Sequence, residues 1–326
     1  MLVRLLRSHQ PYLLFIVPIL AALLWLPAFF HPQYVAPKEE MPLYHLLATF
    51  CHFEIPLVPV VISLLLTLIQ AFLCNYVFNK YELAGKHTYI PSLVFVLLSS
   101  ITTDSLQLQP IMFSSLCAML CLNAILSTFH KQGVLNACFE AGLFASLATL
   151  FYFPSIFLLP FVLVGILYMR PFAIRDWSMV IMGFLLPGIY LLLYYFWTGN
   201  WKTTFIGQDL IAKPYGNQWS KLVYMRPIIE LGGCILIGVI FNFTRSLESG
   251  ARSIQFRSRR AVVRLMFVVG VLVYFLSPAY TYQNTFIALT PIVALISGYL
   301  IWARVIWLVQ LVWLGLTLMV FLNRIW

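Results

Sequence analysis

Three acidic residues stand at the ends of long apolar runs, where they could act as general bases beside a lipid surface. Glu39 and Glu40 are adjacent in HPQYVAPKEEMPLYHLLATFCHFE, residues 31–54, and Asp104 lies in the polar break SSITTDSLQLQP. Neighbouring like charges push their pKa values apart, so such a pair can supply one general base and one electrostatic partner. Acids close to hydrocarbon are rare and raise the expectation of function. These three carboxylates are the candidate catalytic residues.

The same acids also have structural explanations, which the sequence leaves open. Glu39 and Glu40 point opposite ways in an extended chain, and a solvated loop before a helix would place both near its positive N-terminal end. A polar turn accounts equally well for Asp104. His52 and Glu54 are too few to define a metal centre, and no His/Cys cluster has zinc spacing. No metal and no cofactor is predicted.

A second group of residues could bind phosphate. The segment GNWKTTFIGQDLIAKPYGNQWSKLVYMR, residues 199–226, mixes aromatic residues with the cations Lys202, Lys213, Lys221 and Arg226. Arg offers a phosphate group a bidentate contact and Lys a point charge, so the segment is suited to a lipid phosphate. Headgroup anchoring without specificity is the alternative.

The elements that must position these residues are membrane helices. The chain has 326 residues, of which 62% are hydrophobic and 9% charged, and its mean hydropathy is +0.93. A typical soluble domain is about a quarter charged, so this composition excludes a soluble globule, a disordered chain and a nucleic-acid factor. Backbone polar groups in a bilayer must be paired internally, and the alternation typical of a membrane barrel does not occur. The prediction is an all-α, polytopic transmembrane helix bundle.

The apolar runs predict about eleven spans, because a span needs roughly 20 apolar residues. The runs lie near 12–30, 55–78, 89–103, 110–128, 136–152, 154–169, 178–198, 227–244, 262–277, 284–302 and 305–322. Residues 1–326 are predicted as a single transmembrane domain with outer loops near 31–54 and 199–226. Apolar residues in the first loop recur at helical spacing and predict an interfacial helix. They are Leu43, Leu46, Leu47, Phe50 and Phe53.

The charges predict which side each loop faces. With the N-terminus in the cytoplasm, most Lys and Arg residues fall on inner segments, as the positive-inside rule requires. The inner loop 245–264, RSLESGARSIQFRSRRAVVR, holds six Arg and one Glu, which is typical of a topology determinant and anionic-lipid anchor. Most acids, including the three candidates, then face the outer side. The predicted location is the bacterial inner membrane, with the N-terminus cytoplasmic.

Three stretches between Ser99 and Asn200 carry a family resemblance. They read SSITTDSLQLQPIMFSSLCAML, EAGLFASLATLFYFPSIFLLPFVLVGILYMRPF and DWSMVIMGFLLPGIYLLLYYFWTGN, and TYQNTFIALTPIVALISGYLI follows later. The series resembles an uncharacterised family of bacterial polytopic inner-membrane proteins. More distantly it is similar to the GT-C glycosyltransferases, which use polyprenyl-phosphate sugars on the outer side of the membrane.

The GT-C resemblance implies roles for the candidate residues. In those enzymes the first outer loop carries an acidic catalytic motif, and the next outer loop often carries another acid. The acids in these places are Glu39, Glu40 and Asp104. Outer cations hold the lipid phosphate in the family, and the cations in that place are Lys202, Lys213, Lys221 and Arg226. The first loop here is short and contains no DxD or ExD.

Three functions stay open. The first is a GT-C-like glycosyltransferase that uses a polyprenyl-phosphate-linked sugar on the outer face. The second is a non-catalytic membrane subunit or scaffold of an envelope assembly or secretion complex, with a membrane-protein partner. The third is a lipid or solute transporter, which would want ionisable residues at mid-membrane or paired broken helices. Membrane lipids, including polyprenyl phosphate, are the predicted ligands, and nucleic acid is excluded.

Overall fold

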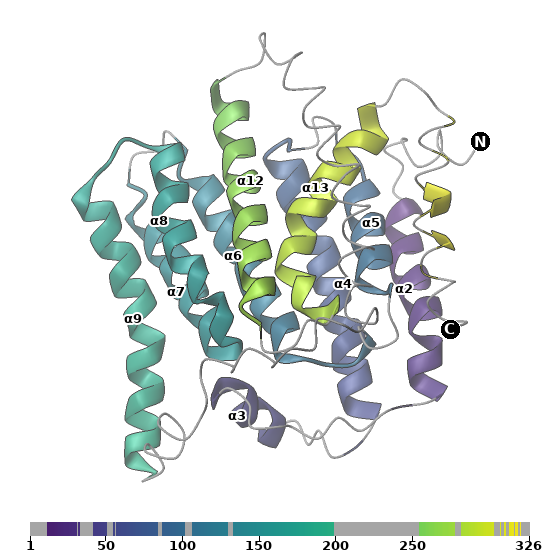
Figure 1. Ribbon diagram of the computed structural model, residues 1–326, viewed down its shortest axis with the longest axis horizontal. Helices are drawn as coiled ribbons and strands as arrows, with labels where there is room; N and C mark the ends of the chain where they lie inside the picture. Colours follow the sequence, from purple (N-terminus) through teal and green to yellow (C-terminus); the bar gives the residue numbers. More distant parts are fainter. Residues whose placement is uncertain are drawn as a thin grey trace.

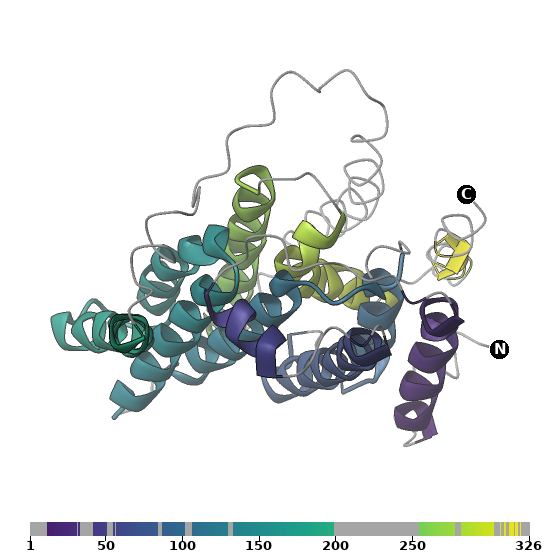
Figure 2. The ribbon, with the colours of Figure 1, turned by 90° about the horizontal axis from the view of Figure 1, so that it is seen from below.

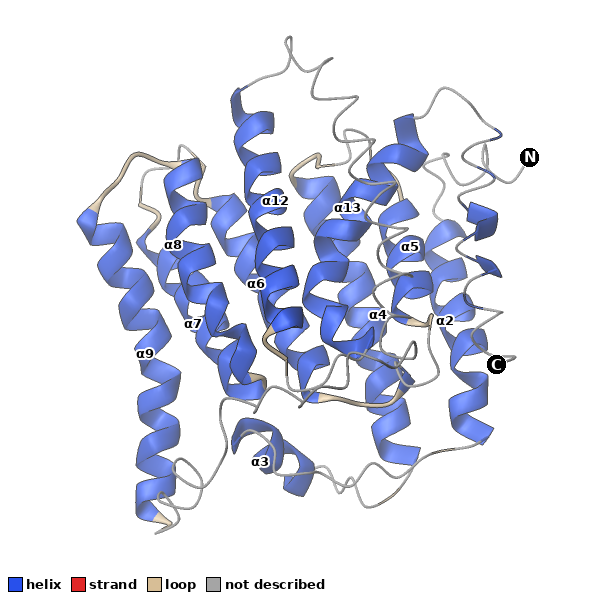
Figure 3. Ribbon diagram, viewed as in Figure 1, coloured by secondary structure: helices blue, strands red, loops and turns tan. Residues whose placement is uncertain are grey.

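The computed structural model is helical throughout the part of the chain that it describes. That part comprises residues 12–30, 32, 42–50, 55, 57–83, 87–101, 106–129, 133–198, 254–277, 282–302, 307, 310, 313–315, 317–318 and 320. Within it, every regular element is an α-helix or a short 3-10 helix, and no strand occurs (Figure 3). The all-α prediction is confirmed.

The helices follow one another with short connections up to residue 198. In order they are α2 (Tyr12–Phe30), α3 (Pro42–Phe50), α4 (Leu57–Lys80), α5 (Ile90–Ser99), α6 (Pro110–Ser127), α7 (Leu135–Phe151), η2 (Phe153–Phe157), α8 (Leu158–Met169), α9 (Ile174–Trp197), α12 (Ile254–Phe275), η5 (Tyr282–Thr285) and α13 (Phe286–Trp302). A proline in the first turn begins both α5 and α6, where its missing N–H removes no helical hydrogen bond.

The long helices lie side by side in a bundle, and α3 lies across one end of it (Figure 1). Seen from that end, α2 and α9 stand at opposite edges (Figure 2). We call the end that carries α3, residues 106–109 and Tyr152 the α3 end. The opposite end carries Lys80, Arg170 and Arg259, and we call it the basic end.

Helices occur at the predicted positions that the structure describes, but fewer of them than predicted are long enough to cross a membrane. In the described residues, α4, α6 and α9 are the three with sufficient length and hydropathy. The shorter apolar helices have 10–17 residues and are Phe15–Phe30, Ile90–Ser99, Leu135–Phe151, Phe153–Met169 and Phe286–Ile301. The chain breaks at Tyr152, before the 3-10 turn that contains Pro154, which keeps α7 and α8 short. The predicted span 227–244 lies outside the described residues, as does most of 305–322.

Charge is divided unequally between the two ends. Most charged residues of the described part lie toward the basic end, namely Lys80, Glu82, Glu140, Arg170, Arg175, Asp176, Arg257, Arg259 and Arg260. Arg264 lies at the middle of α12. The flanks of the bundle expose large apolar side chains instead, such as Phe15 on α2, Ile69 on α4 and Leu192 on α9. Apolar exposure on this scale is typical of surfaces that contact lipid or another protein. It indicates membrane association.

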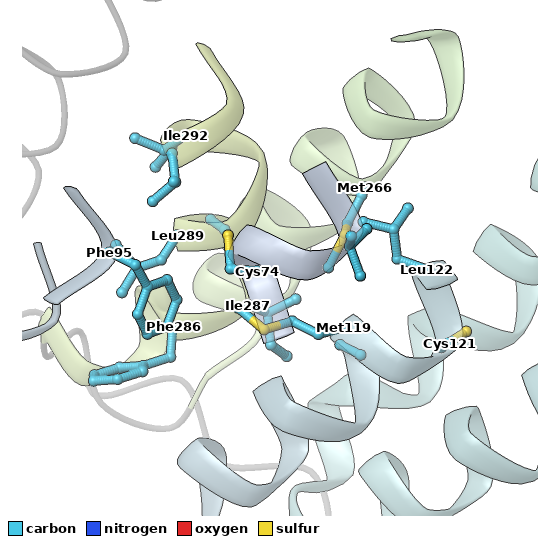
Figure 4. Packing of buried hydrophobic residues seen from close by; sticks show 14 of the residues in the cluster. Cys74, Phe95, Met119, Cys121, Leu122, Met266, Phe286, Ile287, Leu289 and Ile292 are labelled. Carbon is cyan, nitrogen blue, oxygen red and sulfur yellow. The ribbon is translucent and has the colours of Figure 1, made fainter. Parts of the chain in front are cut away.

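Well-buried side chains of α4, α5, α6, α12 and α13 lie close together. Cys74 of α4, Met119 of α6 and Met266 of α12 are almost wholly buried, together with Phe95 of α5 and Ile287 of α13 (Figure 4). Methionine fills irregular gaps well because its unbranched chain adapts. This core holds residues from distant parts of the sequence in one body.

Glycines let α7 and α9 approach each other closely. A Cβ atom added at Gly142 of α7 would overlap the backbone oxygen of Val180. A Cβ added at Gly183 of α9 would overlap the backbone oxygen of Phe139. Small residues allow such backbone contact between membrane helices, where packing rather than the hydrophobic effect drives association. The pairing fixes α9 at the edge of the bundle.

Residues of the sequence RPFAIRDW hold the turn between α8 and α9. Arg170 Nη1 donates to Asp176 Oδ2 over 3.2 Å, and the Asp176 carboxylate is buried in the first turn of α9. The rings of Phe172 and Trp177 meet edge to face with centroids 5.0 Å apart. A helix N-terminus also stabilises a carboxylate, so Asp176 is held from two sides.

Candidate functional site

The predicted site residues lie outside the described residues. The acids among them are Glu39, Glu40 and Asp104, and the cations are Lys202, Lys213, Lys221 and Arg226. His52 and Glu54 lie outside as well. The structure does describe residues that closely follow the three acids in sequence, from Pro42 and from Leu106 onward, and these belong to the α3 end.

Helix α3 is fastened to the α3 end by two tyrosines. The Tyr44 hydroxyl of α3 donates to the backbone oxygen of Leu108 over 3.5 Å. The Tyr195 hydroxyl near the end of α9 donates to the backbone oxygen of Pro42 over 3.2 Å. Pro42 follows Glu40 by two residues, and Leu106 follows Asp104 by two. The two acid-bearing segments therefore lead into residues that meet at one place.

Aromatic packing supports the same contact. The Tyr44 ring meets Phe113 of α6 edge to face at 6.3 Å between centroids, and Phe113 stacks on Phe151 of α7 at 5.0 Å. Tyr44 is buried, whereas His45 beside it is exposed. The helix predicted in the first loop is thus present, and Leu43 and Leu47 pack against the hydrophobic core of the protein. Tyr44, the largest buried side chain of α3 among the described residues, was not predicted.

We expect Tyr195→Phe to loosen α3 without unfolding the bundle. The substitution removes one hydrogen bond to the Pro42 backbone oxygen, which contributes about 1 kcal/mol. Hydrogen–deuterium exchange over residues 42–50 should become roughly fivefold faster, because about 1.4 kcal/mol corresponds to a factor of ten and about 1 kcal/mol to a factor of five. The matched control is Tyr194→Phe, because Tyr194 is the adjacent residue and is about half exposed. Equal exchange in both variants would contradict the assigned tether.

A second polar cluster joins α7 to the segment between α12 and α13. The Tyr152 hydroxyl lies 2.7 Å from Ser277 Oγ and 3.2 Å from Asn284 Oδ1. Ser277 directly follows the C-terminal turn of α12, and Asn284 lies in η5. A phenol has one proton to donate, so the shorter contact to Ser277 is the stronger bond. This cluster places hydroxyl and amide groups at the same end as Tyr44.

Buried polar groups continue from the α3 end into the bundle between α4 and α6. Ser63 Oγ donates to the backbone oxygen of Leu106 over 2.9 Å, and Gln70 Nε2 donates to Ser115 Oγ over 2.9 Å. Ser114 and Ser155 share a hydrogen bond of 2.6 Å between α6 and η2. Hydrogen bonds of this kind hold membrane helices together. Ser63 thereby fixes the residue two positions after Asp104.

The chemistry available at the α3 end is polar and, in the described residues, uncharged. The hydroxyl groups of Tyr44, Ser63 and Tyr152 there form hydrogen bonds within the protein. No group of three His, Cys, Asp or Glu capable of holding a metal occurs in the described part of the chain.

A sequence model for one protein family matches residues 40–325; its description is "Family of unknown function (DUF6427)". The chain belongs to the DUF6427 family. No curated protein matches the chain, and no solved structure matches it. The DUF6427 match begins at Glu40 and includes Asp104 and the candidate cations, so most predicted site residues lie within the family region.

The DUF6427 fold brings together residues that sequence reasoning missed. Tyr44 and Asn284 gave no signal, because each is a single polar residue in or beside an apolar run. Their partners lie far along the chain: Tyr152 and Ser277 are 125 positions apart, and Pro42 and Tyr195 are 153 apart. A tyrosine at the end of an apolar helix is the usual sign of the membrane interface, which alone would have drawn attention to Tyr152 and Tyr195.

Proposed function

We propose that this DUF6427 protein is a multi-pass protein of the bacterial inner membrane with about eleven spans and a cytoplasmic N-terminus. The concentration of described charges at the basic end supports this orientation, because cations collect on the cytoplasmic side. Residue 198 and Ile254 lie at opposite ends of the bundle, as the predicted span at 227–244 requires. The α3 end then faces the periplasm.

The function proposed for the α3 end is glycosyl transfer of the GT-C type from a polyprenyl-phosphate-linked sugar. One observation supports it most: the Tyr44–Leu108 hydrogen bond joins the segment that follows Glu40 to the segment that follows Asp104. Acids supplied by separate loops at one membrane surface suit a reaction between a membrane-bound donor and an acceptor from outside.

In this reaction one carboxylate of Glu39, Glu40 or Asp104 takes the proton from an acceptor hydroxyl as it attacks the anomeric carbon. The bond between that carbon and the phosphate oxygen breaks, and polyprenyl phosphate leaves with the bonding electrons. The cations Lys202, Lys213, Lys221 and Arg226 stabilise the negative charge on the departing phosphate. The hydroxyls and amides of the α3 end position the sugar.

The substitutions Glu39→Gln, Glu40→Gln and Asp104→Asn, made singly and together, test the proposal. Loss of the proton-accepting carboxylate should lower glycosyl transfer at least about 100-fold and cause the polyprenyl-linked donor to accumulate. Envelope glycans and lipid-linked sugars are compared in cells that carry each variant at normal protein level. The control is Glu140→Gln, an exposed acid near the basic end. Unchanged glycans in the triple variant would reject catalysis at this end.

The second candidate is a non-catalytic membrane subunit of an envelope assembly or secretion complex, and α9 favours it. Only 22% of the apolar window of α9 is buried, against 67% for α6. The exposed side chains include Tyr190, Phe196 and Trp197, and aromatic residues are enriched in protein interfaces. This function predicts tolerance of the acid substitutions together with a co-purifying membrane protein. A transporter is less well supported, because the described charged residues other than Arg264, at the middle of α12, lie toward the basic end.

A further inference from the structure

Tyr81 forms a fixed platform at the basic end. It directly follows α4, and its hydroxyl lies 3.1 Å from both the backbone oxygen and Oδ1 of Asn123 on α6. The residue is buried, and its ring is held between the ends of α4, α6 and α12. A ring fixed in this way can place charged neighbours at defined positions.

Two cations from distant parts of the chain gather on this ring. Lys80 Nζ lies 5.2 Å from the Tyr81 ring centroid, and Arg259 Cζ of α12 lies 5.3 Å from it. Arg259 also donates from Nη1 to the Tyr81 backbone oxygen over 3.2 Å and stands 6.0 Å from the Phe129 ring. The ring attracts each cation, but the two positive charges repel each other.

Among the described residues, no acid forms an ion pair with Lys80 or Arg259, because the ion pair found there is that of Arg170 with Asp176. Glu82 is the nearest acid in sequence; it is exposed and acts on Arg259 through space without forming an ion pair. Two clustered cations that no acid of the described residues pairs with suit an anionic ligand, to which a guanidinium and an ammonium group can both donate.

The surface next to Lys80 suits a lipid rather than a soluble anion. Leu65, Ile69 and Tyr76 of α4 are all about half exposed. Their spacing places them on one helix face, and Lys80 follows Tyr76 by one turn on that face. An acyl chain along this stripe would bring its phosphate to the level of Lys80 at the end of the helix. A soluble phosphate would make no use of the stripe.

We propose that Lys80 and Arg259, gathered on Tyr81, bind the phosphate of an anionic phospholipid in the leaflet at the basic end. The Arg guanidinium offers planar donors to phosphate oxygens, and the Lys ammonium adds a point charge. Clusters of cations at this level recognise anionic headgroups. The inference requires that the bundle lies in a membrane, and it is independent of the chemistry at the α3 end.

The test measures lipid binding to the purified full chain in a neutral detergent. Native mass spectrometry compares phosphatidylglycerol with phosphatidylcholine of the same acyl chains. We expect the wild-type chain to prefer phosphatidylglycerol, and Lys80→Gln to weaken that lipid about fivefold, which corresponds to one interfacial cation. Arg175→Gln is the matched control, because Arg175 is an exposed cation at the same end. Equal weakening in both variants, or none in Lys80→Gln, would overturn the assignment.

Two further arms separate the remaining explanations. Arg259→Gln should weaken phosphatidylglycerol as Lys80→Gln does, and Arg259→Lys, which keeps the charge, should retain part of the binding. Full binding by Arg259→Gln would remove Arg259 from the site. Glycerol 1-phosphate, the probe without acyl chains, should not displace phosphatidylglycerol, and displacement would reject the lipid in favour of a soluble phosphate. No glycan is measured, so failure here is distinct from failure of the proposed transferase.

Discussion

Gly183→Ala is expected to destabilise the bundle by about 3 kcal/mol, the upper end of the usual cost of overpacking. The added methyl group would overlap the Phe139 backbone oxygen and stand 3.1 Å from the Leu143 backbone nitrogen. Backbone atoms of a packed helix cannot rotate away as the end of a side chain can, so α7 and α9 would have to separate. Separation would also loosen the contact of Gly142 with Val180 in the same pair.

The matched control for this experiment is Gly188→Ala on the same helix. A Cβ added at Gly188 meets no heavy atom within 4 Å, so the change should be neutral or stabilising by up to about 1 kcal/mol, the helix-propensity difference between the two residues. Thermal unfolding of both variants in detergent, followed by tryptophan fluorescence, gives the comparison. Equal melting temperatures would mean that α7 and α9 do not approach as closely as described.

Helix positions were the most predictable part of the fold, because long apolar runs in this chain are bounded by clear signals. The predicted range 12–30 coincides with α2, and 110–128 differs from α6 by one residue at its end. Pro110 explains the second agreement, since proline is favoured in the first helical turn. Which helices are long enough to span the membrane was harder to predict. Breaks such as the one before Pro154 shorten the helices on either side, and the apolar runs do not show them clearly.

The start of α12 shows where hydropathy misleads. The run predicted at 262–277 begins eight residues too late, because α12 starts at Ile254 and includes the arginines of QFRSRR. Arginine lowers hydropathy but is a good helix former, so the helix continues beyond its apolar part. The contacts of Arg259 with Tyr81 and Phe129 stabilise this extension of α12, and the sequence near Arg259 does not predict them. Burial of Arg259 also lowers the pKa of its guanidinium.

The candidate site was predictable only as a set of loops. Apolar spacing predicted a helix in the first loop, and α3 confirms the helix, but the Tyr44 and Tyr195 tethers that position it depend on contacts across the whole fold. Gly142 and Gly183 are likewise two small residues among many in the sequence. Their importance comes from the backbone that faces each of them, which only the packed structure reveals.

Arg170→Met is the second substitution with a large expected effect, because it leaves the Asp176 carboxylate buried without its partner. Breaking a buried ion pair by removing one side costs about 3–5 kcal/mol. The side chain of Arg170 is 25% exposed, against 9% for Asp176, and the α9 N-terminus continues to stabilise the carboxylate. We therefore expect a loss of about 3 kcal/mol, the lower limit of that range.

A double-mutant cycle distinguishes a buried unpaired charge from simple loss of packing. Adding Asp176→Asn to Arg170→Met removes the unpaired charge, so the double variant should recover about 1 kcal/mol or more relative to Arg170→Met alone. Arg175→Met is the matched control, since this neighbouring exposed cation should cost less than about 0.5 kcal/mol. Unfolding in detergent with increasing denaturant measures the wild-type chain, Arg170→Met, Asp176→Asn, the double variant and Arg175→Met. A strictly additive double variant would show that Arg170 and Asp176 act independently and that the turn between α8 and α9 is held by Phe172 and Trp177 instead.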